Sequence, residues 1–209
     1  MQVISSKAFR GSSCKSISFA PTAQLTKIGG GAFHGCANLN SLEIPFSVEE
    51  IGEGAFLKAG LQSIRFEMNS KLRRVRGGLF KNCLKLTSIE IPANVEEIDQ
   101  KPFSRSGVRI ALFALESKLK KIGKQAFKKC ALNTICIPSS VESIENQAFE
   151  GCSELTSVLF ECDSKLKKVS SNAFHGCQTV QIIEYPLSVK FEVDSDEEDQ
   201  NVDENEEDD

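Results

Sequence analysis

The sequence lacks the features that would anchor the chain in a membrane or direct it out of the cell. No run of about 18 or more apolar residues occurs, which excludes a membrane-spanning helix and membrane insertion. Residues 1–9 hold no apolar stretch long enough for a secretory signal, and no Asn-x-Ser/Thr glycosylation sequence is present. On these absences alone we expect a cytoplasmic protein.

Motifs that carry chemistry are equally scarce. The two histidines, His34 and His175, stand six repeat units apart, and no Cys-x-x-Cys pair, glycine-rich phosphate loop or nucleophile elbow occurs. We therefore expect no catalytic residues, no metal and no cofactor. The chain is predicted not to be an enzyme.

Charge divides the chain into two parts. The formal net charge of −4 comes from 25 basic and 29 acidic residues, and 12 of the acidic residues but no basic one lie in residues 192–209. The remaining residues therefore carry 25 basic and 17 acidic side chains, a net charge of +8. A segment as acidic as residues 192–209 cannot collapse into a core. We expect a folded domain at residues 1–191 and a disordered acidic tail at residues 192–209.

An internal repeat decides the fold class. Phenylalanine recurs eight times at intervals of 22 to 25 residues, and Ile or Val stands five residues before each of these phenylalanines. The eight are Phe9, Phe33, Phe56, Phe80, Phe103, Phe127, Phe149 and Phe174. Because units this small cannot bury their own apolar side, the spacing predicts a solenoid of about eight stacked units of roughly 23–24 residues. The eight rings are expected to form one internal column.

Each unit contains two candidate strands joined by turns. Segments such as residues 39–44 (LNSLEI) read L-x-x-L-x-L, and their alternation is typical of a half-buried strand. A second short strand is expected at residues 48–51 and their equivalents, whereas the Ala-Phe segment is too short for a stable helix. The sequence predicts a right-handed β-solenoid with parallel strands and short 3₁₀-like turns.

The repeat closely resembles the BspA-like class of leucine-rich repeats. Residues 28–36 (IGGGAFHGC) and 144–152 (IENQAFEGC) show its motif, and the resemblance extends from residue 4 to about residue 189. It is most similar to the versions in surface-antigen families of trichomonads and other anaerobic protists and bacteria. The resemblance implies a curved solenoid for adhesion or protein binding, and a location at the cell surface. A chain that starts within a repeat also permits a piece of a longer array.

The units alternate with a period of 47 residues, and this alternation sorts the charges. Two positions in each second strand are mostly basic in one unit and acidic in the next. They read Thr26-Lys27, Glu49-Glu50, Arg73-Arg74, Glu96-Glu97, Lys120-Lys121, Glu142-Ser143 and Lys167-Lys168. Opposite charges one unit apart should pair and contribute about 0.2–1 kcal/mol each. We expect a neutralised face and no nucleic acid, although the basic pairs leave a stripe for nucleic acid or an anionic surface as an alternative.

Five of the eight cysteines lie three residues after a repeat phenylalanine. They are Cys36, Cys83, Cys130, Cys152 and Cys177. This column needs a small, semi-apolar side chain, which a free cysteine supplies. Cys130, Cys152 and Cys177 lie on consecutive units, where the geometry permits a disulfide.

The exposed face of the first strands offers a candidate contact surface. The fifth position of the L-x-x-L-x-L segment changes from polar to apolar along the array: Ser18, Glu43, Arg65, Glu90, Leu112, Cys136, Leu159, Glu184. Because exposed apolar patches usually mark contact sites, we predict a partner patch there. The patch contains Leu112, Cys136, Leu159, Ile110 and Ile182, with Arg65, Glu90 and Arg109 at its rim. The alternative is that a bend of the array or a loop covers these residues.

Two functions remain open on the sequence. The first is a non-enzymatic protein-protein interaction or adhesion module that binds a protein ligand and is monomeric or weakly associated end to end. The second is an intracellular leucine-rich repeat protein whose acidic tail binds basic partners such as histones.

Overall fold

The computed structural model describes residues 2–20, 24–180, 182–183 and 190–192. The predicted disorder of the acidic tail lies outside these residues, apart from Glu192. Within them the structure has 16 strands and no helix.

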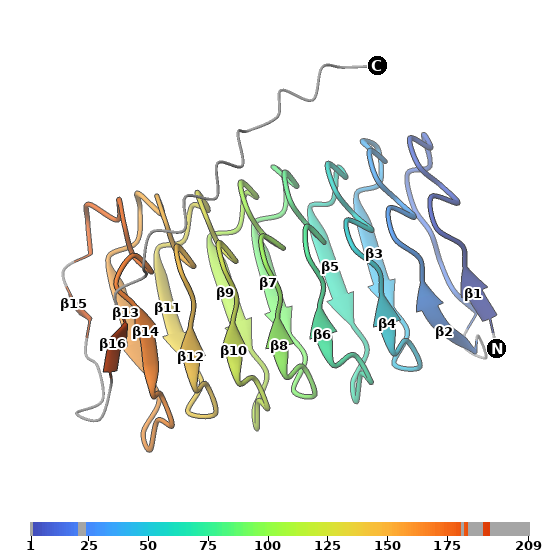
Figure 1. Cartoon of the computed structure of the whole chain (residues 1–209). Helices are drawn as coiled ribbons and strands as arrows, with labels where there is room; N and C mark the ends of the chain where they lie inside the picture. The colour runs from blue at the N-terminus through green and yellow to red at the C-terminus, as the bar shows by residue number, and fades with distance from the viewer. Residues whose placement is uncertain (1, 21–23, 181, 184–189, 193–209) are drawn as a thin grey trace.

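The strands form two layers that run the length of a slab, with turns along both long edges (Figure 1). Layer A contains β1 (Gln2–Ile4), β2 (Leu25–Ile28), β4 (Glu50–Ile51), β6 (Arg74–Val75), β8 (Glu97–Ile98), β10 (Lys121–Ile122), β12 (Ser143–Ile144), β14 (Lys168–Ser170) and β16 (Lys190–Glu192). Layer B contains β3 (Ser41–Ile44), β5 (Ser63–Phe66), β7 (Ser88–Ile91), β9 (Ile110–Phe113), β11 (Thr134–Ile137), β13 (Ser157–Phe160) and β15 (Ile182–Ile183). Each layer consists of two sheets, which meet between β4 and β6 and between β5 and β7.

All strand pairs of the described residues run parallel, and each strand pairs with the equivalent strand one unit away. The burial of layer B alternates along its strands: Leu42 and Ile44 face the core, whereas Ser41 and Glu43 are exposed. The prediction of a parallel β-solenoid is confirmed.

The phenylalanines form the predicted column through the core. Adjacent rings lie 5.0 to 5.5 Å apart between centroids and are within 12° of parallel. This separation is slightly larger than the usual strand spacing of about 4.8 Å, as expected for offset-stacked rings. The six interior rings are completely buried, whereas the first ring, Phe9, is 42% exposed.

The turn around each phenylalanine uses two kinds of hydrogen bond in alternation. In one unit the amides of Ala32, His34 and Cys36 donate to carbonyls three residues earlier, as in a 3₁₀ turn. The intervening amides, such as that of Phe33, instead donate to the next unit, here to the Ala55 carbonyl at 2.7 Å. The predicted 3₁₀-like turn is thus interrupted at every second residue. Half of its amides hold neighbouring units together.

The five column cysteines are hydrogen-bond donors as well as small core residues. Each thiol donates to the carbonyl of a repeat phenylalanine in the preceding unit, at 2.9 to 3.1 Å. For example, Cys83 Sγ donates to the Phe56 carbonyl at 3.0 Å, and Cys130 Sγ to the Phe103 carbonyl at 3.0 Å. Sequence reasoning found the column but not this bond, which needs the position of the neighbouring unit.

Burial keeps the thiols of Cys83 and Cys130 protonated, whereas the hydrogen bond with Cys152 lowers the pKa of Cys177. Loss of solvation raises the pKa of Cys83 and of Cys130 to about 12. The hydrogen bond with Cys177, followed by burial, raises the pKa of Cys152. All eight cysteines are free in the structure, including the three on consecutive units.

Replacing an interior ring should cost more stability than replacing the end ring. We expect Phe80→Ala to lower the free energy of unfolding by about 3–5 kcal/mol, because it leaves a cavity in a filled column. Phe9→Ala should cost only about 1–2 kcal/mol, because that ring is already partly in solvent. Urea unfolding followed by circular dichroism measures both. Equal losses would show that the rings do not act as one buried column.

The buried thiols should make stability depend on pH in alkaline solution. A thiol of the unfolded chain ionises near pH ~8.5, whereas those of Cys83 and Cys130 ionise near 12 in the folded state. Their stabilising contribution is therefore complete below about pH 8.5 and is lost as the pH rises toward about 12.

The control is the double variant Cys83→Ser with Cys130→Ser, because Ser106 already occupies an equivalent position and a hydroxyl does not titrate there. Urea unfolding under reducing conditions at about pH 7 and about pH 10.5 should show a larger loss of stability for the unaltered chain than for the variant. The same loss in both proteins would contradict the assignment.

Candidate functional site

The predicted partner patch lies on the outer face of layer B. Ile110 and Leu112 occupy the first and second outward positions of β9. The second outward position is Cys136 in β11 and Leu159 in β13. The register pairs Thr134 with Ile110 and Cys136 with Leu159. Three adjacent strands therefore bring these four side chains onto one surface.

These side chains are open to solvent. Ile110 is 53% exposed, Leu112 55% and Leu159 44%, and Cys136 is also exposed. No described segment covers them. Partial burial, with the nearby Glu161 carboxylate, raises the pKa of Cys136, so the thiol remains neutral.

The three residues predicted for the rim are exposed to solvent. Arg65 and Glu90 are exposed on β5 and β7, and the register sets Glu90 beside Leu112. Arg109 is exposed immediately before β9. The backbone of Ile182 pairs with Ser157 of β13, but its side chain lies outside the described residues.

Sequence reasoning missed a second exposed apolar column in the turns after layer B. Met68 is 87% exposed and Leu115 is 92% exposed, and Cys162 at the equivalent position is also exposed. Leu115 follows β9 by two residues, in the turn that leaves this strand of the patch. The 47-residue spacing of these three residues was the available signal.

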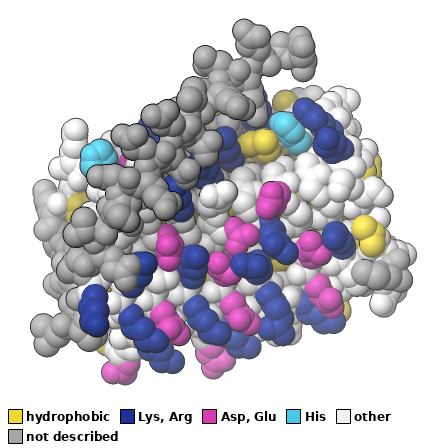
Figure 2. Space-filling model, in the orientation of Figure 1, with side chains coloured by type: hydrophobic (Ala, Val, Ile, Leu, Met, Phe, Trp, Pro, Cys, Tyr) yellow, Lys and Arg dark blue, Asp and Glu magenta, His cyan; other side chains and the backbone are white. Residues whose placement is uncertain are grey.

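The outer face of layer A carries the predicted charge ladder. Basic and acidic side chains alternate across the slab in Figure 2. Lys27 pairs with Glu50 at 3.0 Å and Arg73 with Glu96 at 2.8 Å, and Arg74 pairs with Glu97. Further along the ladder, the Lys167 ammonium group donates a hydrogen bond of 2.6 Å to the Glu142 carboxylate, which lowers the pKa of Glu142. The prediction that neighbouring units pair opposite charges is confirmed.

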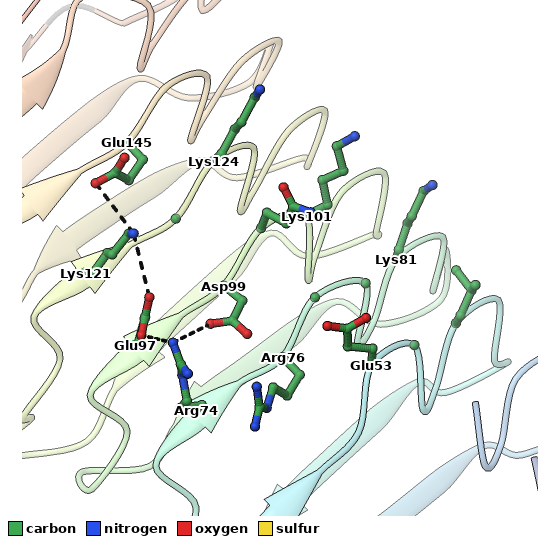
Figure 3. Close-up of a pocket in the computed structure, with 16 residues that line it drawn as sticks. Glu53, Arg74, Arg76, Lys81, Glu97, Asp99, Lys101, Lys121, Lys124 and Glu145 are labelled. Atoms are coloured by element: carbon green, nitrogen blue, oxygen red, sulfur yellow. Dashed lines mark hydrogen bonds and ion pairs between the residues drawn. The ribbon is translucent and has the colours of Figure 1, made fainter. Parts of the chain in front are cut away.

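A shallow groove of about 760 Å³ runs beside the ladder, where the chain leaves layer A for the phenylalanine turns (Figure 3). On its floor Arg74 lies 3.5 Å from Asp99, and Lys121 bridges Glu97 at 3.7 Å and Glu145 at 3.9 Å. Loss of solvation raises the pKa of Asp99, and Arg74 partly opposes this rise. The charges of the floor are thus largely satisfied by one another.

The histidines do not form a site together. His34 and His175 each follow a phenylalanine of the column, and six stacking steps of 5.0 to 5.5 Å separate their turns. Among the described residues, no group of three or more His, Cys, Asp or Glu side chains could hold a metal ion. The same part of the chain contains no helix that could cross a membrane.

Comparison with protein families gives one result over almost the whole chain. The BspA type leucine rich repeat region matches in six copies, over residues 2–131 and 74–193. No curated protein matches the sequence.

Solved structures show the same fold at low identity. A leucine-rich repeat protein from Bacteroides ovatus ATCC 8483 is 22% identical with a TM-score of 0.56, over 91% of this chain and 66% of that chain. The pneumococcal vaccine antigen PcpA is 19% identical with a TM-score of 0.57, over 93% of this chain and 72% of that chain.

The chain is shorter than these proteins. A leucine rich cell surface protein from Faecalibacterium prausnitzii A2-165 is 29% identical with a TM-score of 0.49, over 71% of this chain but only 32% of that chain. This chain therefore spans about a third of that protein and about two thirds of the Bacteroides protein. With its repeats matched from residue 2 to residue 193 and stacked as a parallel solenoid, the chain belongs to the BspA type of leucine-rich repeat proteins.

Proposed function

We propose that the chain is a non-enzymatic protein-interaction module and that its contact surface is the partner patch of layer B. The observation that carries this proposal is the exposure of Ile110, Leu112, Cys136 and Leu159 on three adjacent strands. Singly exposed apolar residues are common, but a contiguous group with a charged rim is typical of a contact surface. Ile182 belongs to the proposed patch through the position of its backbone beside β13.

The geometry also favours binding over catalysis. The patch is a flat wall of strands, and parallel strands hold its side chains at fixed spacing without any need for ordering on binding. Arg65 and Glu90 lie on the two strands before the apolar residues, and Arg109 directly precedes β9; charged groups around a contact surface contribute to orientation and specificity.

Adhesion is the setting we propose for this module, in keeping with the resemblance to surface-antigen repeats. The ligand is then a protein of a host cell or of its matrix. The solenoid would act as a monomer or associate weakly end to end.

A second candidate function is supported by the composition of the tail. Residues 192–209 contain 12 acidic and no basic side chains, which is the charge pattern that attracts histones and other basic partners. In that function the tail is the binding element, and the patch plays no part.

Two full-length variants separate the two functions. In the patch variant, Leu112→Asp and Leu159→Asp place two charges on the apolar surface. In the tail variant, the 11 acidic residues of 193–209 become Asn or Gln, so that the chain length is kept. Surface plasmon resonance against immobilised extracellular-matrix proteins and against immobilised core histones measures the binding of each variant.

We expect the patch variant to lose at least about tenfold in affinity for a matrix protein, because each buried contact residue that carries binding is worth more than about 1 kcal/mol. The tail variant should bind that protein as the unaltered chain does. The matched control is Ser16→Asp with Ser63→Asp, which puts two charges on the same face of the polar half, two units apart like Leu112 and Leu159. Unchanged binding by the patch variant would refute the patch, and loss of histone binding in the tail variant alone would favour the second function.

A further inference from the structure

The phenylalanine turns of four consecutive units form a strongly basic edge, which we call the basic ridge. Residues 53–58, 77–82, 100–105 and 124–129 contain seven basic side chains and one acidic, Glu53, a net charge of +6. The seven are Lys58, Lys81, Lys101, Arg105, Lys124, Lys128 and Lys129. Figure 3 shows Lys81, Lys101 and Lys124 in a row on this edge, pointing away from the ribbon.

The ridge stacks like charges, whereas the ladder on layer A pairs opposite charges. Backbone hydrogen bonds between units join Lys58 to Lys81 at 3.0 Å, Lys101 to Lys124 at 2.9 Å and Arg105 to Lys128 at 2.8 Å. Each bond sets two cations on adjacent units, and like charges at this spacing repel. Lys128 also pairs with Glu150 at 3.1 Å. An anionic segment on the ridge would relieve the repulsion.

The backbone of the ridge gives no structural reason for these side chains. Lys58, Lys101, Arg105 and Lys129 have φ between 56° and 59°, in the left-handed region that favours glycine. Equivalent positions elsewhere hold glycine, both in two turns of the ridge (Gly54 and Gly78) and in other units (Gly11, Gly31, Gly35, Gly151 and Gly176). The long cationic side chains therefore add conformational cost as well as repulsion.

The acidic tail starts at the same edge of the slab. β16 ends at Glu192 and pairs in parallel with β14, with Ser170 opposite Glu192. The chain after β14 runs directly into the phenylalanine turn of its unit, so Glu192, which lies opposite Ser170, is at the edge of layer A that faces the ridge. Seventeen residues follow Glu192, and an extended chain of that length reaches roughly 55 Å. The ridge begins only a few units of about 4.8 Å away, so the tail is long enough to cover it.

We propose that residues 193–209 bind along the basic ridge of their own chain. The 11 carboxylates of this segment complement the net charge of +6 on the ridge. Attachment through β16 gives the tail an effective concentration on the order of millimolar, so a weak contact is enough to keep the ridge occupied. An acidic segment of another protein, or a basic partner of the tail, then has to displace this contact first.

Carbodiimide cross-linking of the full-length chain at low ionic strength tests the contact directly. Zero-length links should join tail carboxylates to ridge lysines, and peptide mapping by mass spectrometry identifies them. Lysines of the turns on the other edge provide an internal control and should form no links with the tail. They are Lys71, Lys118 and Lys165. Tail links spread equally over both edges would overturn the proposal.

A competition experiment supplies an independent measurement. A fluorescent peptide of residues 192–209 is titrated with the unaltered chain and with the tail variant, both full length. The tail variant should bind the peptide at least about tenfold more tightly, because its own tail no longer occupies the ridge. Raising the salt concentration from about 0.05 M to about 0.5 M should weaken the binding of the peptide to the tail variant about tenfold, since exposed charges are screened.

Matched triple variants then locate the site. Within the tail variant, Lys101→Gln, Lys124→Gln and Lys129→Gln should weaken peptide binding at least about tenfold. The control, Lys71→Gln, Lys118→Gln and Lys165→Gln, removes the same charge and should leave it unchanged within about twofold. Equal peptide binding by the tail variant and the unaltered chain would overturn the proposal. A tail-dependent dimer at low salt would also do so, because it would show that the tail occupies the ridge of a second copy.

Discussion

The spacing between units governs this structure. Parallel strands fix each unit about 4.8 Å from the next. Each side chain therefore has to pack, at about that distance, against the side chain at the same position of the neighbouring unit. Phenylalanine satisfies this condition by offset stacking, at 5.0 to 5.5 Å between ring centroids. The thiols satisfy it in another way, because each donates to a carbonyl of the preceding unit. The core is thus built from contacts between neighbours along one axis.

The same condition explains why so much of the fold could be predicted. Equal intervals between Phe33, Phe80 and Phe127 identify positions that must coincide in space, so a one-dimensional pattern already contains the stacking of the rings. The alternation in residues such as Leu42, Glu43 and Ile44 gives the inward and outward faces. What the sequence could not supply was any bond whose two partners belong to different units and different positions. The thiol-to-carbonyl bonds and the alternating amides of the turn are of this kind.

The candidate site shows the same limit. Leu112 and Leu159 could be assigned to the outer face because strand alternation decides it, and both are exposed. Met68 and Leu115 escaped notice because they lie in turns, where no periodicity separates inward from outward residues. Whether an exposed apolar group is a contact surface depends on a partner, and this information is not contained in the repeat. The repeat therefore predicts the wall and leaves its ligand open.

The two charged surfaces follow from one rule applied to different positions. Where the 47-residue alternation exchanges sign between units, as at Lys27 and Glu50, stacking brings opposite charges together and the face neutralises itself. Where consecutive units carry the same sign, as at Lys101 and Lys124, stacking concentrates charge instead. The backbone sets the distance between units, so the solenoid cannot move these like charges further apart. The acidic segment that follows β16 carries the opposite charge, which is why we propose it as the partner of this column.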